Sequence, residues 1–150
     1  MPEKDINKQY VIFSLGKQNY GIDVMDSREI ITTGDLTFIP EAPSFVDGVI
    51  NLRDQIIPIV DLGKKMNLKS ETDKNKVIII SMQNVLIGLL VEDILEIKKI
   101  DKINKANALK ASQKVNIVFI EGILSFNEKL IIVINMKKLF DDFNLEINLD

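Results

Sequence analysis

The polar and apolar positions of this 150-residue chain predict short β-strands separated by tight turns. The apolar runs are rich in β-branched residues and are bounded by turn residues such as those at 16–19 and 82–84. Helical periodicity is weak and predicts only short turns at 42–46, 63–67 and 136–142. The fold class expected is all-β with a few short helical turns. The predicted strands are 10–15, 20–24, 77–82, 85–91, 117–124 and 130–135.

The same pattern occurs twice along the chain. When the sequence is aligned with itself, residues 10–30 match residues 77–97 with seven identities in 21 positions. These identities include Gly21 with Gly88 and Glu29 with Glu96. Similar composition alone would produce matching apolar runs, but it does not explain matched glycine and glutamate positions. An internal duplication is therefore the preferred explanation. The two alignments pair 10–30 with 77–97 and 48–66 with 122–140.

The duplication predicts a single domain, 1–150, made of one unit at 9–66 and a second at 76–140. A polar segment, NLKSETDKNK, joins the two units. A unit of roughly 60 residues buries too little surface to be stable alone without a metal or disulfide. We therefore expect the units to share an apolar interface or to exchange a strand. Five short strands per unit suit a small β-barrel, which hides its edges.

The composition argues against catalytic and metal-binding chemistry. The chain has no cysteine and no histidine, which removes thiol nucleophiles, thiolate metal sites, disulfides and imidazole bases. Asp23, Asp26 and Glu29 lie close in the sequence, but no further residues complete a metal or acid–base site around them. No glycine-rich phosphate-binding motif occurs. The sequence therefore predicts no enzyme activity, no metal and no cofactor.

Charge and hydropathy limit the expected partners and location. A net charge of −3 disfavours nucleic acid and anionic membranes as the main partners. The first residues, MPEKDINK, lack the apolar run of a signal peptide. The longest apolar stretches are interrupted or too short to cross a bilayer. A soluble cytoplasmic protein without direct membrane insertion is expected.

One stretch, GVINLRDQIIPIVDL at 48–62, departs from the apolar pattern. It carries Arg53 between two apolar strands and Pro58 inside the second of them. The aligned positions of the second unit hold Asn127 and Ile132, so Arg53 acts in one unit only. An exposed arginine can anchor an interface with its five donors and flat face. The alternative is a structural role, as a hairpin cap or as the partner of a nearby carboxylate.

Three segments together resemble the CheW family of bacterial chemotaxis coupling proteins. They are QYVIFSLGKQNYGIDVMDSREI at 9–30, PEAPSFVDGVINLR at 40–53 and PIVDL at 58–62. The resemblance extends over 9–140. It implies two tandem SH3-like five-stranded β-barrels packed together. It also implies a non-catalytic adaptor that couples the cytoplasmic tips of transmembrane chemoreceptors to the histidine kinase CheA, whose regulatory domain has the same fold.

The resemblance further implies a largely monomeric protein that is recruited to membrane-associated receptor arrays. Two alternatives stay open at this point. One is a CheW-like adaptor of a kinase pathway other than chemotaxis. The other is an SH3-like nucleic-acid-binding module, which the acidic balance and the few aromatic residues disfavour.

The resemblance also predicts a receptor-binding region beside the groove between the two barrels. Asn51, Leu52 and Arg53 match its central motif, and Glu29 matches an acidic position associated with partner contact. Because Glu96 repeats Glu29, a structural role in both barrels is an equal alternative.

Four other positions bear on this region. Val77 and Ile78 match positions near the groove, with burial in the core as the alternative. Asp54 stands where the family usually has glycine, and Ser27 stands where apolar residues are more common. Asp54 is expected to obstruct a close backbone approach or to change partner preference, because glycine adopts positive φ more easily.

Overall fold

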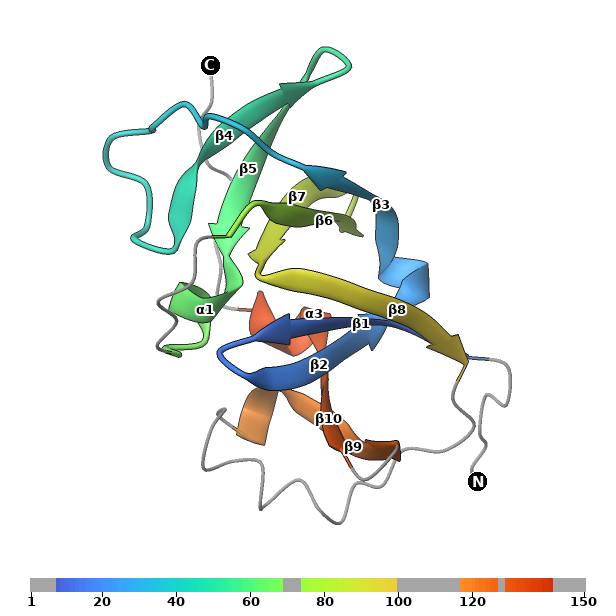
Figure 1. Ribbon diagram of the computed structural model, residues 1–150. Helices are drawn as coiled ribbons and strands as arrows, with labels where there is room; N and C mark the ends of the chain where they lie inside the picture. The colour runs from blue at the N-terminus through green and yellow to red at the C-terminus, as the bar shows by residue number, and fades with distance from the viewer. Residues whose placement is uncertain (1–7, 69–73, 100–116, 127–128, 142–150) are drawn as a thin grey trace.

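The protein forms two five-stranded β-sheets that pack face to face (Figure 1). The computed structural model describes residues 8–68, 74–99, 117–126 and 129–141. An all-β fold with two five-stranded units and few short helical turns is thereby confirmed. The strands are β1 (Gln9–Leu15), β2 (Gln18–Asp23), β3 (Ser27–Thr32), β4 (Val46–Leu52), β5 (Gln55–Asp61), β6 (Lys76–Met82), β7 (Val85–Val91), β8 (Asp93–Lys99), β9 (Ile120–Phe126) and β10 (Lys129–Ile134).

Short helical turns follow several of the strands. They are η1 (Val24–Asp26), α1 (Leu62–Lys65), η3 (Ile117–Phe119) and α3 (Met136–Leu139). α1 and α3 begin in the same way, because Asp61 Oδ1 accepts from Lys64 N at 3.2 Å and Asn135 Oδ1 accepts from Lys138 N at 3.0 Å. The helical turn expected at 42–46 is wrong. One hydrogen bond, from Val46 N to the Pro43 carbonyl at 2.9 Å, makes a reverse turn there that does not continue as a helix.

Each sheet takes strands from both halves of the chain. The first sheet has the order β8-β1-β2-β10-β9, and the second has the order β3-β6-β7-β5-β4. The chain passes from the first sheet to the second through η1 and returns between β7 and β8. The parallel pairs β2–β10 and β5–β7 each join a strand of one half to a strand of the other. Neither half therefore contains all the strands of a sheet.

The apolar side chains form three layers because strand residues alternate between the two faces of a sheet. The central layer contains residues of both sheets, such as Val11 of β1 and Ile78 of β6, and joins the sheets. A smaller cluster lies on the outer side of each sheet. One consists of Tyr10, Ile12, Leu124, Ile131 and Val133, and the other of Ile57, Ile59, Val77, Ile79 and Leu90.

Residues that align in the sequence occupy equivalent layers in the structure. Val11 and Ile78, which are aligned, both lie in the central layer. Ile12 and Ile79, the next aligned pair, lie in the two outer clusters. The sequence repeat is therefore also a repeat of side-chain environments.

Pro58 is buried in an inner strand, which is an unusual place for a residue without an N–H group. It pairs with Val49 of β4. On its other side, β7 pairs with β5 only from Ile59 to Asp61. Pro58 thus stands just outside the parallel pairing, where its missing donor breaks no bond of that ladder.

We expect either half of the chain to aggregate or to fold poorly when it is expressed alone. The reason is that each half lacks strands of both sheets and leaves its share of the central layer exposed. The experiment is to divide the chain within 67–75 and to compare the solubility and thermal melting of the two pieces with those of the whole. Two soluble pieces that each melt cooperatively would contradict this expectation.

Gly88 of β7 provides a test of the packing around the outer cluster of the second sheet. A β-carbon at this position would lie 2.5 Å from Ile59 Cδ1 and 2.8 Å from Val77 Cγ1. We expect Gly88→Ala to lower the free energy of unfolding by about 1–3 kcal/mol, because neighbouring side chains must shift. Urea denaturation would measure the change.

Gly34 supplies the matched control. A β-carbon there would meet no atom within 4 Å, so Gly34→Ala should leave stability unchanged or slightly increased. Equal effects of the two substitutions would show that Gly88 is not a packing constraint.

Candidate interaction site

The hairpin between β4 and β5 presents the Asn-Leu-Arg motif at its tip. Arg53 and Asp54 form its two-residue turn with φ values of 49° and 68°. Two successive residues with positive φ are typical of a type I′ turn, whose twist matches that of the flanking strands. Asn51 Oδ1 accepts a hydrogen bond from the Asp54 backbone N–H at 3.1 Å. Asn51 therefore stabilises the turn that positions Arg53.

Arg53 forms an ion pair and hydrogen bond with Glu29 of β3 through its Nη2 atom. β3 and β4 are the two edge strands of the second sheet, so this pair brings the opposite edges together. The sheet is thus curled at this point. The Arg53 side chain is 70% exposed and that of Glu29 is 32% exposed. Most of the Arg53 side chain remains accessible to a partner.

The structure separates the predicted site residues into two groups. Asn51, Arg53 and Glu29 lie together around the hairpin tip, and Leu52 is half-buried against the outer cluster. Val77 and Ile78 are fully buried, one in the outer cluster of the second sheet and the other in the central layer. A fully buried side chain makes no direct contact with a partner, so any contribution of these two residues acts through packing.

An exposed apolar margin, which the sequence did not single out, lies where the central layer reaches the surface. Ile30 of β3 pairs with Ile78, and Ile97 of β8 pairs with Val11. Their partners are fully buried in the central layer, whereas Ile30 and Ile97 are 40% and 52% exposed. The sequence repeat aligns Ile30 with Ile97, and the two residues are identical. This identity is the feature of the sequence that could have indicated a shared role for them.

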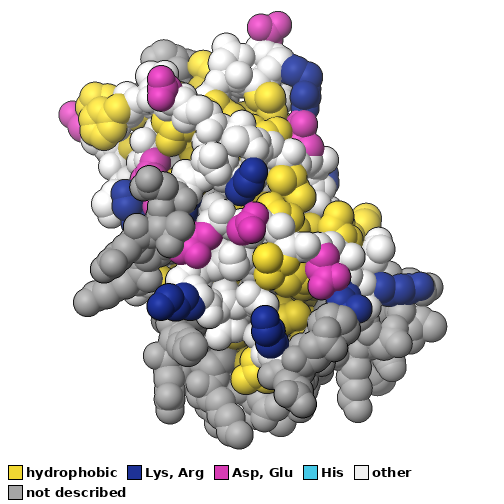
Figure 2. All heavy atoms as spheres, in the orientation of Figure 1, with side chains coloured by type: hydrophobic (Ala, Val, Ile, Leu, Met, Phe, Trp, Pro, Cys, Tyr) yellow, Lys and Arg dark blue, Asp and Glu magenta, His cyan; other side chains and the backbone are white. Residues whose placement is uncertain are grey.

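Two further apolar side chains extend this margin. Met25 of η1 and Leu95 of β8 are exposed as well. Figure 2 shows hydrophobic side chains gathered on the face of the molecule that carries η1, β3 and β8. We refer to Met25, Ile30, Leu95 and Ile97 as the apolar margin. Apolar side chains that cluster on a surface in this way are typical of interaction sites.

The described residues offer no metal-binding group of three or more acidic side chains. Within the same residues, no helix is long and apolar enough to span a membrane. The chemistry that the site does offer is an accessible, oriented guanidinium group and an apolar surface.

Comparison with known proteins identifies the family. The model of the CheW-like domain matches residues 9–144. This chain belongs to the CheW-like family. It is 28% identical to the chemotaxis protein CheW of Treponema pallidum over 152 aligned residues, which cover 97% of this chain and 89% of that protein. It is 30% identical to the chemotaxis protein CheW of Thermotoga maritima over 135 residues, which cover 89% of this chain and 88% of that protein.

A solved structure supports the same assignment. The scaffolding protein TtCheW of Thermoanaerobacter tengcongensis superimposes on this CheW-like chain with a TM-score of 0.80 and 32% sequence identity. The superposition covers 97% of this chain and 92% of that protein. The resemblance inferred from the three sequence segments is therefore confirmed.

Asp54 stands where the family usually has glycine, and the effect of this difference on the turn can be tested by measuring stability. Asp54→Gly should raise the free energy of unfolding by about 0.5 kcal/mol, because glycine adopts the positive φ of this turn position at no steric cost. The Asn51 hydrogen bond uses only the backbone N–H and is kept. Asp54→Ala serves as the control and should be less stable than the parent, since it keeps the β-carbon and loses the polar group that tolerates this conformation. Urea melts would measure both, and a destabilised Asp54→Gly variant would show that the carboxylate itself supports the turn.

Proposed function

We propose that this protein is a non-catalytic scaffold that couples the cytoplasmic tips of chemoreceptors to the histidine kinase CheA in bacterial chemotaxis. The observation that carries the proposal is the exposed, ion-paired Arg53 at a hairpin tip of a chain whose CheW-like match spans residues 9–144. The curated relatives are named chemotaxis proteins, and the structural neighbour is named a scaffolding protein.

The proposed receptor surface combines the hairpin tip with the apolar margin. Arg53 and Asn51 supply polar groups, and Ile30 and Ile97 supply apolar area. Glu29 and Ile30 are consecutive residues of the edge strand β3 and point to its opposite faces, so the polar and apolar parts of this surface meet along that edge. An interface usually needs both kinds of group, since apolar anchors provide affinity and charged groups provide orientation and specificity.

The ion pair between Arg53 and Glu29 restricts the Arg53 side chain before a partner binds. A free arginine side chain loses several rotatable bonds of freedom when a partner immobilises it, and that loss opposes binding. Glu29 already holds the guanidinium group against β3, so less freedom remains to be lost. Glu29 would in this way orient Arg53, whether or not it also touches the receptor.

We place the proposed kinase contacts at two further exposed apolar positions. Ile56 of β5 and Leu130 of β10 are aligned in the repeat and are 50% and 49% exposed. Each sheet thus presents one of these apolar side chains, on β5 and on β10, as expected for weak contacts with a same-fold domain of the kinase. Such contacts permit a largely monomeric cytoplasmic protein that assembles only at receptor arrays.

Arg53→Glu should lower the affinity for a receptor tip about thirtyfold or more. Loss of an interface arginine often costs about 2 kcal/mol, and each 1.4 kcal/mol corresponds to a factor of ten. The measurement is a titration of the purified cytoplasmic tip of a matched receptor with each variant. Melting curves serve as the folding control, and binding to the kinase should be largely kept.

Two controls separate a binding role from a structural one. Gln55→Glu likewise introduces a carboxylate at an exposed position of the same hairpin and should change receptor affinity little. The double variant Arg53→Glu with Glu29→Arg restores an ion pair between the strands, but it places the positive charge on β3. Recovery of receptor binding in the double variant would show that Arg53 only joins the strands, and the proposed contact would then be wrong.

A further inference from the structure

Met25 of η1 differs in exposure from the other methionines that the structure describes. It is 75% exposed, whereas Met66 and Met136 are 5% and 3% exposed and pack in the central layer. Met82 is half-buried against the same layer. Met1 lies outside the described residues. Met25 therefore contributes little to the core, and its thioether is open to reagents in solution.

The repeat shows that the fold does not require an apolar residue at this position. The aligned counterpart of Met25 is Glu92. Glu92 Oε2 accepts a hydrogen bond from the Gly16 backbone N–H at 3.0 Å, so in the second unit this position supports a turn of the chain itself. In the first unit it adds an exposed apolar side chain to the apolar margin. An apolar group that replaces a charged one on the surface of a single unit is typical of an interaction site.

The backbone of Met25 is held on both sides, independently of its side chain. Its N–H donates to Asp23 Oδ1 at 2.9 Å, and its carbonyl oxygen accepts from Arg28 Nη1 at 3.2 Å. These bonds fix η1 whatever the chemical state of the sulfur atom. A modification of the Met25 side chain should therefore change the surface of the protein and leave its fold intact.

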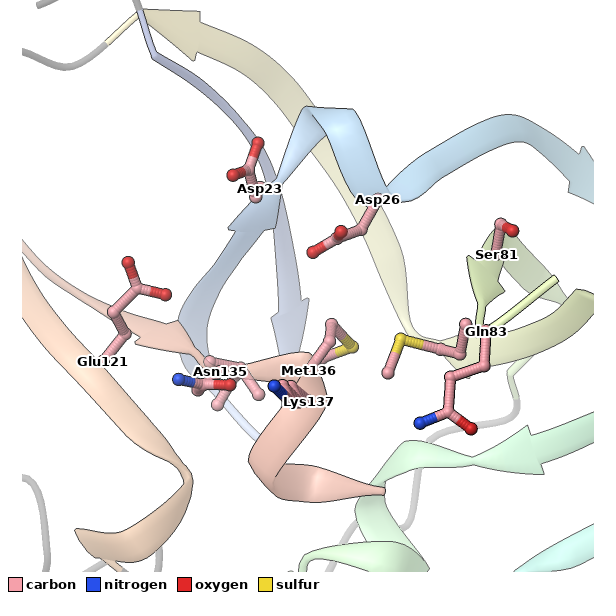
Figure 3. A pocket seen from close by; sticks show the side chains of 10 residues that line it. Asp23, Asp26, Ser81, Gln83, Glu121, Asn135, Met136 and Lys137 are labelled. Carbon is pink, nitrogen blue, oxygen red and sulfur yellow. The ribbon is translucent and has the colours of Figure 1, made fainter. Parts of the chain in front are cut away.

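Two other methionines provide an internal comparison. Met82 and Met136 line a cavity of about 400 Å³ between the two sheets, with Met136 at the start of α3 (Figure 3). A small oxidant can enter such a cavity, but both side chains also pack against the central layer. From the exposure of the three residues, we expect Met25 to react first, Met82 more slowly and Met136 last.

Oxidation of a thioether reverses its contribution to an apolar surface. When hydrogen peroxide reacts with methionine, the sulfur atom gains one oxygen and loses two electrons, while the O–O bond breaks and the peroxide is reduced to water. The sulfoxide is polar and accepts hydrogen bonds. Burial of such a group against an apolar partner without a donor costs free energy that the thioether does not cost.

We propose that Met25 is a reversible oxidation site, and that its conversion to the sulfoxide by hydrogen peroxide weakens binding of the receptor tip to the apolar margin. This proposal rests on the proposed function, because it assigns regulation to the same surface. Methionine sulfoxide is reduced again by methionine sulfoxide reductases, so the change can be reversed.

The test treats the whole purified chain with dilute hydrogen peroxide and follows the gain of one oxygen at each methionine by peptide mass mapping. We expect Met25 to react about tenfold faster than Met66 and Met136, as its exposure implies. The oxidised chain should bind the purified receptor tip about tenfold more weakly than the reduced chain, with an unchanged melting curve. Methionine sulfoxide reductases with a thiol reductant should restore the affinity. Met25→Gln, which places a polar side chain there permanently, should bind weakly without peroxide.

Two variants serve as matched controls. Met25→Leu has no sulfur atom at this position, so its receptor affinity should be the same before and after peroxide. Met82→Leu should lose as much affinity on peroxide treatment as the parent does. The proposal is overturned if Met82 is oxidised before Met25, if the Met25 sulfoxide binds as tightly as the reduced chain, or if either control behaves otherwise. These outcomes leave the proposed function intact, whereas a reduced parent chain that does not bind the receptor tip would overturn both.

Discussion

The apolar layer between the two sheets supports every other feature of the molecule. One face of each sheet contributes to it, with residues such as Val11, Phe13, Ile78 and Leu89, all fully buried. Hydrophobic stabilisation grows with the apolar area removed from water, so this shared layer stabilises both sheets together. The outer clusters are smaller, and each belongs to one sheet. The apolar margin is a place where the layer between the sheets reaches solvent.

The two units of the repeat agree at their packed positions but differ at one hairpin turn and at one capping position. Arg53 in the first unit is aligned with Asn127 in the second. An ion pair like that between Arg53 and Glu29 can therefore form in only one sheet. The capping residue Asp61, which also binds Lys74, is aligned with Asn135, which caps α3 without a charge. A duplicated fold has thus acquired two unlike surfaces without a change in its packing pattern.

Most of the fold could be predicted from the sequence, because strand alternation and turn residues are local signals. The pairing of strands across the two halves could not, since alternation shows which face of a strand is buried but not which strand lies beside it. Val77 and Ile78 were placed near the groove by the resemblance, with burial in the core as the alternative, and the structure shows both fully buried. The partner of Arg53 was also missed, because Glu29 lies 24 residues away and no spacing rule connects the two.

The exchange of strands between the units bears on how such a chain could have arisen. A single ancestral unit with this connectivity would have lacked strands of its own sheet, and could not have folded as an independent monomer. Two identical copies, however, could complete each other as a symmetric dimer, in the arrangement that the fused chain now adopts. Gene fusion would then have turned an intermolecular association into an intramolecular one. Freed from symmetry, each half could evolve its own surface.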